Sequence, residues 1–353
     1  MADILGLGCT HWPILAFPDD RLSGTFHKTL ASPACPAHFK DPANWPQALR
    51  DELGDDQGLA AAGRYSAALA DRFRQVRAEL DRFDPDLVLI WGDDQYENFR
   101  EEFVPPFCVM AYDDLAMQPW RGPPGGIVNR WNEPPDRTFT VRGHRRAGQA
   151  LTRALIGAGI DAAYAYRPGI EGGLSHAFSN TLLFLDWDRR GFPYPVLPFA
   201  VNCYGSALFD AKGGLAGLYR TAEQRAASAD PPSPPPWRCM DVGAAVARFF
   251  AASPYRVALI ASASWSHAFL SPRHGFLFSD MEADRSLFEA LCAGDYGYWR
   301  SRTTQEMEQA GQHEVLNWMM LVGAMQELGR KAEVIDYMES YLFTSQKCFA
   351  VFR

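Results

Sequence analysis

DLVLIWGDDQ, at residues 86–95, is a short aliphatic run that begins after a proline and ends in polar side chains. A continuous apolar run of this length is typical of a β-strand that is covered on both faces, as in a parallel or mixed sheet. Three further segments have the same character: ILGLGCTH at 4–11, PVLPFAVNCYG at 195–205 and RVALIASASWSH at 256–267. Together the four segments predict a central sheet that is mixed or mostly parallel.

Amphipathic helical patterns lie between the predicted strands. Residues 60–83 place apolar side chains three or four positions apart, with charged side chains on the opposite side. Residues 143–159 repeat the pattern and stop at glycines, which are typical of a helix end. Two more helices are expected at 241–253 and 305–328. Because strands and helices alternate, we predict an α/β fold whose sheet is flanked by helices.

Two stretches are too rich in proline and glycine to form regular structure. They are GPPGGIVNRWNEPPD at 122–136 and the proline-rich loop DPPSPPPW at 230–237. A length of 353 residues allows either one large domain or two small ones, and the proline-rich loop is a conceivable boundary. We expect a single catalytic domain over 1–353, because the candidate site residues come from both sides of that loop.

Composition narrows the class of protein. A net charge of −8 argues against a nucleic-acid binder, which usually carries a basic stripe. The first residues show no signal-peptide pattern, and no run approaches the roughly 20 apolar residues that span a membrane. The seven cysteines are scattered and form no CxxC pair. We therefore expect a cytoplasmic protein that binds neither nucleic acid nor a membrane, and a homo-oligomer as the common default.

Polar side chains at the ends of the predicted strands are the candidates for chemistry. His11 closes the first strand, residues 93–95 (Asp-Asp-Gln) close the second, and His267 closes the fourth. His176 lies in a loop with glycine and serine, and Glu314 lies on a largely apolar predicted helix. A carboxylate in such a helix is costly unless a cation or hydrogen-bond donors accompany it. In open α/β sheets, ligands gather at the carboxyl ends of the strands.

Each of these residues also has an ordinary structural explanation. A single histidine at a strand end is more often a hydrogen-bonded structural residue than a ligand, and Glu314 could lie on a solvated helix face. His313 adjoins Glu314 but would point about 100° away around a helix, so both cannot easily face one metal. As a set, however, the residues match the ingredients of a two-histidine, one-carboxylate metal site, which leaves positions open for substrate and dioxygen. The remaining histidines are expected at the surface: His27, His38, His144 and His274.

These residues occur in motifs that resemble the class III extradiol ring-cleavage dioxygenases, of the protocatechuate 4,5-dioxygenase catalytic-subunit type. The resemblance is spread over most of the chain, and the order and spacing of the motifs make it more specific than any one motif alone. In chain order the motifs are CTHWP at 9–13, DLVLIWGDDQYENF at 86–99, VPPF at 104–107, VRGH at 141–144, SHAF at 175–178, PVLPFAVN at 195–202, RVALIASASWSHAFLSPRHGF at 256–276 and AGQHEVLNWMMLVGAM at 310–325.

The resemblance implies a role for individual residues. His11 and Glu314 become metal ligands, and His267 becomes the acid/base residue. His176 becomes a second catalytic candidate, and His144 a candidate substrate contact. Two tryptophans that flank the site in sequence, Trp12 and Trp265, are candidate substrate-binding residues, with packing in the core as the alternative.

This chain departs from the family at one position, where it has Gln95 in place of a histidine ligand. Gln95 could bind the metal through its side-chain oxygen, which makes a harder site than an imidazole does. Asp93, Asp94 or a loop histidine such as His27 or His38 could take its place. The third outcome is an impaired metal site, in a protein that binds ligands or performs different chemistry.

The resemblance also implies a reaction. Fe(II) is the expected cofactor, with Mn(II) or another divalent metal as the alternative, and the expected substrates are O₂ and a catechol-like or aminophenol-like aromatic compound whose ring is opened. The class of function would then be aromatic compound catabolism. The alternative is a divergent relative that performs hydrolysis or decarboxylation, or only binds a ligand. A small partner subunit is also conceivable, because some family members pair a catalytic chain with one.

Overall fold

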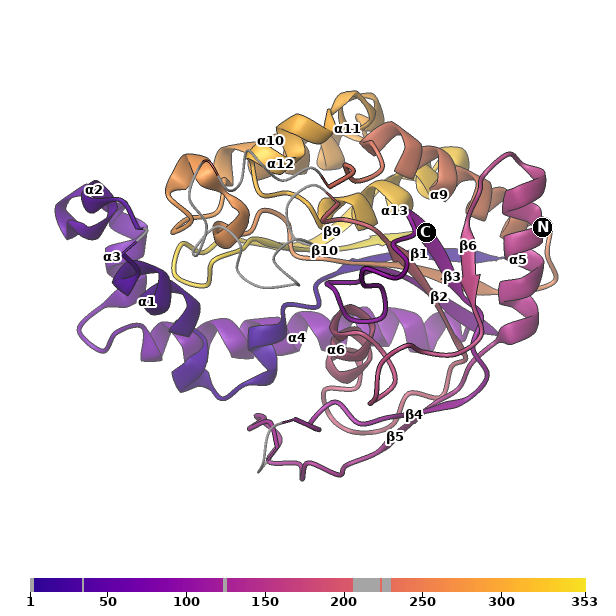
Figure 1. Cartoon of the computed structure of the whole chain (residues 1–353), viewed down its shortest axis with the longest axis horizontal. Coiled ribbons are helices and arrows are strands. Elements are labelled where there is room, and N and C mark those ends of the chain that lie inside the picture. The colour runs from indigo at the N-terminus through magenta and orange to yellow at the C-terminus, as the bar shows by residue number, and fades with distance from the viewer. Residues whose placement is uncertain (1–2, 34, 123–125, 206–222, 224–229) are drawn as a thin grey trace.

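The computed structural model describes residues 3–33, 35–122, 126–205, 223 and 230–353. Among these residues, the centre of the molecule is an eight-stranded sheet with the strand order β6-β3-β7-β2-β8-β1-β10-β9 (Figure 1). The strands span Ile4–Cys9 (β1), Leu87–Asp93 (β2), Phe107–Met110 (β3), Ala163–Ala165 (β6), Val196–Val201 (β7), Val257–Ser262 (β8), Glu333–Met338 (β9) and Lys347–Phe352 (β10). A separate two-stranded sheet pairs β4 (Leu115–Met117) with β5 (Phe139–Val141).

The four strands predicted from apolar runs form the middle of the sheet. β7, β2, β8 and β1 are neighbours and run parallel to one another. β10 pairs antiparallel with β1, and β3 pairs antiparallel with β7, so the sheet is mixed towards its edges. β8 follows the proline-rich loop in sequence and lies between β1 and β2, so one sheet is built from both sides of that loop. The predicted α/β fold with a mostly parallel sheet is confirmed.

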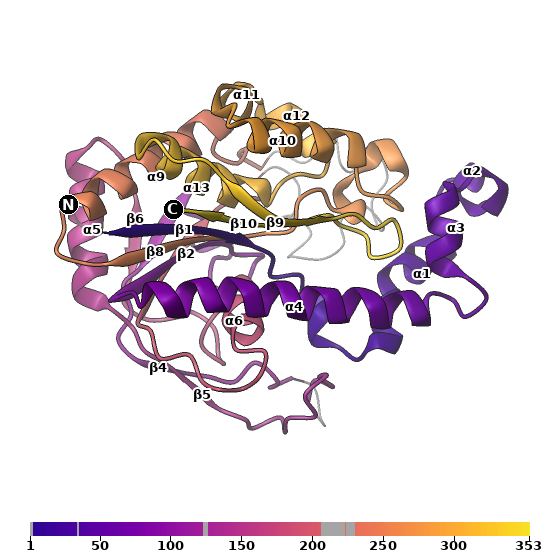
Figure 2. The same cartoon turned by 180° about the vertical axis from the view of Figure 1, so that it is seen from behind.

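Helices cover both faces of this sheet (Figures 1 and 2). Leu89 and Trp91 of β2 pack into the core on one face, and Val88 and Ile90 between them pack into the core on the other, as the alternation along a strand requires. One face is covered by α5 (Arg145–Gly157), α9 (Pro236–Ala251), α10 (Met281–Ala293), α11 (Tyr296–Ser301) and α13 (Val315–Glu327). The other face is covered by α4 (Leu59–Phe83) and α6 (His176–Leu185).

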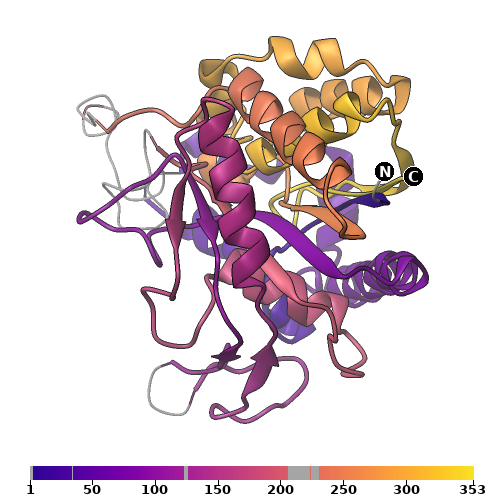
Figure 3. The same ribbon diagram turned by 90° about the vertical axis from the view of Figure 1, so that its right-hand side faces the viewer.

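Small helices complete the described structure. α1 (Gly24–Ala31), α2 (Ala37–Lys40) and α3 (Gln47–Leu53) form an arm that extends from the body beyond one end of α4 (Figure 2). α12 (Thr304–Gln309) precedes α13, and α5 lies beside α9 at one side of the molecule (Figure 3). Among the described helices, none has the length and hydrophobicity that a membrane span needs.

Close contacts between glycines and neighbouring elements fix the position of α13. A Cβ added at Gly323 would lie 2.2 Å from the Met240 carbonyl oxygen, and one added at Gly243 would lie 1.9 Å from the Met320 carbonyl oxygen. α13 and α9 therefore touch backbone to backbone. A Cβ at Gly8 would lie 2.1 Å from the Trp318 ring, so the absence of a side chain on β1 lets α13 approach the sheet. These contacts bring the beginning of α13 to the end of β1.

The prediction of one continuous helix over 305–328 is wrong, and the difference matters for the site. The chain forms two helices there, because Gly311 takes a left-handed conformation with φ of 72° and interrupts the helix between α12 and α13. Glu314 is consequently the N-cap residue of α13 and not a residue on an apolar helix face. The predicted loop at 230–237 is also shorter than expected, since α9 begins at Pro236, a residue type that suits a first helical position.

Candidate metal centre

Three buried side chains from distant parts of the sequence meet at the carboxyl ends of the parallel strands. His11 lies two residues after β1, Asp93 is the last residue of β2, and Glu314 caps α13. Nε2 of His11 lies 3.3 Å from Oδ1 of Asp93 and 3.3 Å from Oε2 of Glu314. All three residues are buried. Because the ends of parallel strands meet at one edge of a sheet, this is where the topology favours a ligand.

Among the described residues, several polar atoms of this cluster have no hydrogen-bond partner. They include Nε2 of His11, Oδ2 of Asp93 and Oε2 of Glu314, all of which are buried. Leaving a buried polar atom without a partner costs about 1–3 kcal/mol, so several such atoms in one place call for an explanation. Nδ1 of His11 lies 3.0 Å from the Ser262 carbonyl oxygen, which can only accept a hydrogen bond. Nδ1 therefore carries a proton, and Nε2 is the ring nitrogen that faces the two carboxylates.

The cluster places two buried carboxyl groups, those of Asp93 and Glu314, beside the single imidazole of His11. Burial raises the pKa of Asp93 to about 6, and the negative charge of Glu314 adds to this increase. Burial also opposes the ionisation of Glu314, but the charges of His267 and His11 outweigh it and hold the pKa of Glu314 well below its usual value. Two carboxylates thus compete for the same imidazole in a site that is buried from solvent. A divalent cation at this position would satisfy both carboxylates and the imidazole lone pair, so the residues present fit a metal.

His267 and Tyr204 contact the other oxygen of the Glu314 carboxylate. Nε2 of His267 lies 3.1 Å from Oε1, and the Tyr204 hydroxyl donates a hydrogen bond to the same oxygen. His267 is held by its backbone N–H, which donates to the Gly311 carbonyl at 2.9 Å. Tyr204 was missed by sequence reasoning. It lies near the end of the segment predicted as the third strand and three residues after β7, so the rule that ligands gather at strand ends could have identified it.

His176 lies on the other side of His11, as the first residue of α6. The two imidazole rings are 5.2 Å apart between centroids with an angle of 76° between their planes. Ligand atoms of His11, Asp93 and His176 all lie within 4.8 Å of one another. Nδ1 of His176 lies 2.8 Å from Oε2 of Glu97, and its backbone N–H donates to Oε1 of Glu97 at 2.9 Å. Burial acts to lower the pKa of His176, but Glu97, with Asp93 and Glu314, raises it to about 10.

Asp94 and Gln95 both lie in the turn that follows β2. Oδ1 of Asp94 accepts hydrogen bonds from the backbone N–H groups of Glu97, Asn98 and Phe99 at 2.9–3.2 Å. Asp94 therefore stabilises the turn, as aspartates commonly do, and this turn carries Glu97 to His176. Gln95 is half-buried in the same turn, two residues beyond Asp93. The predicted role of Gln95 as a metal ligand stays a prediction.

The structure does not bring the other proposed substitutes for the missing histidine to the cluster. His27 lies on α1, where its ring Nε2 is 3.3 Å from the Gln57 carbonyl oxygen. His38 lies on α2, where its ring contacts the adjacent Phe39 with centroids 4.0 Å apart. Both helices belong to the arm (Figure 2). Of the alternatives weighed from the sequence, Asp93 is the one with a carboxylate beside His11.

His144 is placed at the opposite edge of the sheet from His11. It caps α5 by accepting a hydrogen bond from the Ala147 N–H, and its ring contacts Tyr255, which precedes β8. Gly143 pairs with Val196, the first residue of β7. A strand of six residues spans about 20 Å, which separates His144 from the candidate metal centre. This placement does not support the predicted contact between His144 and substrate.

The two predicted tryptophans are buried in the core. Trp12 packs against Tyr65 and Phe343, and Nζ of the buried Lys347 lies 4.0 Å from the centroid of its ring. Trp265 makes edge contacts with Trp299 and Trp318. Both environments are those of residues that pack in the core, which was the alternative to substrate binding for these two tryptophans. Their predicted contact with substrate stays a prediction.

Asp284 of α10 ties together the two segments that carry His267 and Glu314. Its carboxylate accepts hydrogen bonds from the backbone N–H and the hydroxyl of Ser266 and from the side-chain amide of Gln312, the last at 2.7 Å. Burial raises the pKa of Asp284 to about 7 even though these donors oppose the increase. Sequence reasoning missed this residue, because an aspartate in an amphipathic helix carries no signal of such a role.

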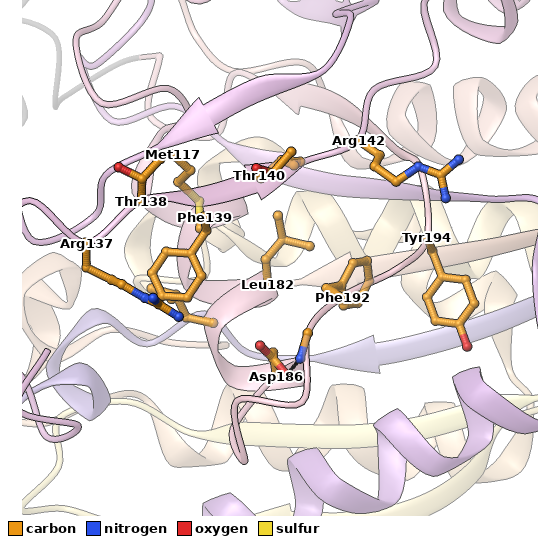
Figure 4. A pocket seen from close by; sticks show the side chains of 13 residues that line it. Met117, Arg137, Thr138, Phe139, Thr140, Arg142, Leu182, Asp186, Phe192 and Tyr194 are labelled. Carbon is orange, nitrogen blue, oxygen red and sulfur yellow. Dashed lines mark hydrogen bonds between the residues drawn. The ribbon is translucent and has the colours of Figure 1, made fainter.

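A separate cavity of about 210 Å³ lies between β5, the carboxyl-terminal half of α6 and residues 186–194 (Figure 4). Phe139, Leu182 and Phe192 line its apolar part, and Asp186 lies at its edge. None of the residues of the candidate metal centre lines this cavity, so the two are distinct.

An α/β sheet with a buried cluster of imidazoles and carboxylates at its strand ends defines a candidate metal-dependent enzyme. Residues 222–352 match the family model described as the catalytic LigB subunit of aromatic ring-opening dioxygenase. These residues therefore carry a LigB family domain, the domain of the class III extradiol dioxygenase superfamily. The family predicted from the sequence motifs is thereby confirmed, and enzymes of this family depend on a non-heme metal.

Curated relatives with the same name come from several bacteria. The chain is 26% identical over 301 residues to a 2,3-dihydroxyphenylpropionate/2,3-dihydroxicinnamic acid 1,2-dioxygenase of Paraburkholderia xenovorans (strain LB400), with 79% of this chain and 85% of the relative covered. It is 30% identical over 142 residues to the corresponding dioxygenase 2 of Pseudomonas putida, with 40% of this chain and 38% of the relative covered. The chain is 27% identical over 222 residues to the dioxygenase of the same name from Comamonas testosteroni, with 63% of this chain and 51% of the relative covered. Two of these three matches thus span about half of the relative or less.

Among solved structures, the uncharacterized protein JW3007 from Escherichia coli K12 aligns with a TM-score of 0.46 and 11% identity. The alignment covers 80% of this chain and 92% of that chain. A likeness at this level adds nothing to the assignment.

Proposed function

We propose that this protein is a non-heme metal-dependent extradiol dioxygenase that opens the ring of a catechol-like or aminophenol-like aromatic compound with O₂. The observation that carries the proposal is the convergence of His11, Asp93 and Glu314, whose buried atoms include several without a hydrogen bond from any described residue. Membership of the ring-opening dioxygenase family and the names of the relatives support the same reaction.

The proposed metal ligands are His11, Glu314 and Asp93, and the proposed metal is Fe(II), with Mn(II) as the alternative. An imidazole with carboxylates suits either ion, and the bound ion would bring the two oxygens of a diol and dioxygen together. Asn317, one turn along α13 from Glu314, lies 3.4 Å from Oδ1 of Asp93 through its side-chain amide and thus helps to hold that carboxylate. Asn180 of α6 donates to the backbone carbonyl of His11 at 3.2 Å and fixes the other side of the site.

His267 is the proposed acid/base residue. Within the described part of the chain its Nε2 makes no hydrogen bond and lies 3.1 Å from Oε1 of Glu314, so a substrate bound at the cluster would come within its reach. It would accept the proton of a substrate hydroxyl and return a proton to the product, and such a group typically contributes about 10²–10⁴-fold to the rate. Burial of the ring excludes bulk water from this transfer.

The test is to purify the protein without oxygen, measure bound metal, and follow oxygen consumption with a panel of catechols and aminophenols. 2,3-Dihydroxyphenylpropionate is the first compound to try, because the relatives are named for it. We expect bound iron or manganese and oxygen uptake with at least one diol. The absence of both metal and oxygen uptake with every compound would remove the proposal.

His267→Ala gives the sharper result. We expect turnover to fall by about 10²–10⁴ while metal content stays unchanged, because a proton-transfer group is lost and the ligands remain. His144→Ala is the matched control, since that histidine lies at the other edge of the sheet, and it should leave both quantities unchanged. Loss of metal in His267→Ala would instead assign that residue to the ligand set.

Asp93 also favours a second candidate function. A carboxylate in place of the imidazole makes the site harder and more negative, which suits a metal without redox chemistry and a reaction such as hydrolysis or decarboxylation. Turnover of an aromatic acid or ester in the complete absence of oxygen, with Mg²⁺ or Mn²⁺ added, would identify this alternative.

A further inference from the structure

We propose that His176 supplies the second imidazole of the metal site, with Glu97 as the carboxylate that orients it. The proposal rests on the proposed function to the extent that a metal binds at the cluster. It gives His176 a different role from the acid/base role expected from the sequence, and it explains how this chain can hold a metal although Gln95 stands where the family has a histidine.

The first argument is the geometry of the two rings. The His11 and His176 rings are 5.2 Å apart between centroids and lie at 76° to each other. When two imidazoles bind one metal with metal–nitrogen distances of about 2.1 Å, each ring centroid is roughly 3.2 Å from the ion, so the centroids are about 5 Å apart. Ligand atoms of His11, Asp93 and His176 also lie within 4.8 Å of one another, and a bound cation would draw them closer.

The second argument is independent of the first and concerns the far nitrogen of each ring. A histidine that binds a metal almost always donates its other ring N–H to a carboxylate or a carbonyl, which fixes the ring and makes the ligand nitrogen more basic. His11 does this with the Ser262 carbonyl at 3.0 Å, and His176 does it with Glu97 at 2.8 Å. Over the part of the chain that the structure describes, Nε2 of His176 has no hydrogen bond, so it is the nitrogen available to a metal.

The third argument is that Glu97 is itself held in place. Its second oxygen accepts the backbone N–H of His176 at 2.9 Å, so one carboxylate grips both the ring and the backbone at the beginning of α6. The turn that carries Glu97 is fixed by Asp94, which accepts three backbone N–H groups. An imidazole held this firmly suits a ligand, whose position must not vary.

Charge supports the same assignment. Asp93, Glu97 and Glu314 are three carboxylates around two imidazoles. A metal that displaces the proton of the His176 ring leaves both rings neutral and these groups with a charge of −3, which a divalent cation reduces to −1. A cation bound between His11 and His176 is therefore favoured by the field of the surrounding carboxylates as well as by the lone pairs.

The experiment measures metal binding without turnover. The metal-free full chain is titrated with Co²⁺ under nitrogen, and affinity is determined by competition with a chelator while the visible spectrum reports the ligand geometry. The variants are His176→Ala and the isosteric Glu97→Gln, with His267→Ala and His144→Ala as matched histidine controls. We expect Co²⁺ affinity to fall by at least about 100-fold in His176→Ala and by about 10–100-fold in Glu97→Gln, with both controls within about twofold of the original protein.

Three results would overturn the proposal. Unchanged affinity and spectrum in His176→Ala would return that residue to an acid/base role and leave the proposed function intact. The second test uses the X-ray absorption spectrum of the Co²⁺-loaded His267→Ala variant, so it does not depend on whether His176→Ala folds. A single bound imidazole in that spectrum would also return His176 to an acid/base role, whereas two imidazoles would support the proposal. Failure of the original protein to bind Co²⁺, Fe²⁺ or Mn²⁺ would remove the proposed function and the ligand assignment together.

Discussion

At the scale of single residues, the two oxygens of Glu314 have different neighbours. Tyr204 donates a hydrogen bond to Oε1, whereas Oε2 lies beside His11 and has no hydrogen bond from the residues that the structure describes. The tyrosine therefore orients the carboxylate so that one oxygen is directed at the candidate metal position. Tyr204→Phe removes only the hydroxyl, and we expect metal affinity to fall about 10-fold because the ligand loses its fixed orientation. A competition titration checks this, and an unchanged affinity with reduced turnover would place the hydroxyl in contact with substrate instead.

Asp93 links metal binding to the stability of the metal-free protein. Its pKa is raised to about 6 in the folded protein, against about 3.9 when unfolded, so the folded state binds the proton more tightly. The metal-free protein should therefore lose stability as pH rises from about 4 through 6, because the carboxylate must ionise in a buried site. Asp93→Asn should unfold at a higher temperature than the original protein at pH 7 without metal, and the difference should vanish near pH 4. Saturating metal should reverse the order, and a variant that is less stable without metal would contradict this account.

At the scale of elements, the break between α12 and α13 is the feature that places Glu314. The apolar pattern continues through the break, so periodicity alone predicted one helix. A Cβ on Gly311 would lie 2.4 Å from the Ser271 hydroxyl and 2.6 Å from the His267 carbonyl oxygen, and these contacts come from a loop about 40 residues away. The interruption therefore depends on a tertiary contact that no local pattern contains.

This contact can be tested with two glycines of similar conformation. Gly311 has a φ of 72° and Gly329, just after α13, has a φ of 67°, but a Cβ at Gly329 would meet nothing within 4 Å. Gly329→Ala should cost about 1 kcal/mol of unfolding free energy, from backbone strain alone. Gly311→Ala should cost more and should also lower activity, because the clash displaces the backbone of His267. Equal losses of unfolding free energy for the two variants, measured by chemical denaturation, would contradict this account, because they would show that the loop of His267 moves away without cost.

At the scale of the whole molecule, the parts predicted from the sequence are those that depend on local pattern. Four apolar runs gave the middle of the sheet, because parallel strands covered on both faces must be apolar throughout. His11, His176, His267 and Glu314 were found from motifs and strand ends, and the structure brings them together. Tyr204, Glu97 and Asp284 were missed, since each acts only through a partner distant in sequence. The position of His144, far from the cluster, could not be predicted from its motif. It depends on sheet topology, which determines at which end of the strands a loop lies.

The last prediction concerns how a metal would act on the entire fold. The proposed ligands lie just after β1, at the end of β2 and at the beginnings of α6 and α13, so an ion between them joins both ends of the chain and both sides of the proline-rich loop. Because the ligands are assembled only in the folded state, metal should stabilise folding by mass action, by about 2.7 kcal/mol at a free concentration of 100 times Kd. The melting temperature of the metal-free protein should therefore rise with added Fe²⁺ or Mn²⁺ in a single transition. Glu314→Gln should lose this increase and His144→Ala should keep it, and an increase that survives in Glu314→Gln would place the metal elsewhere.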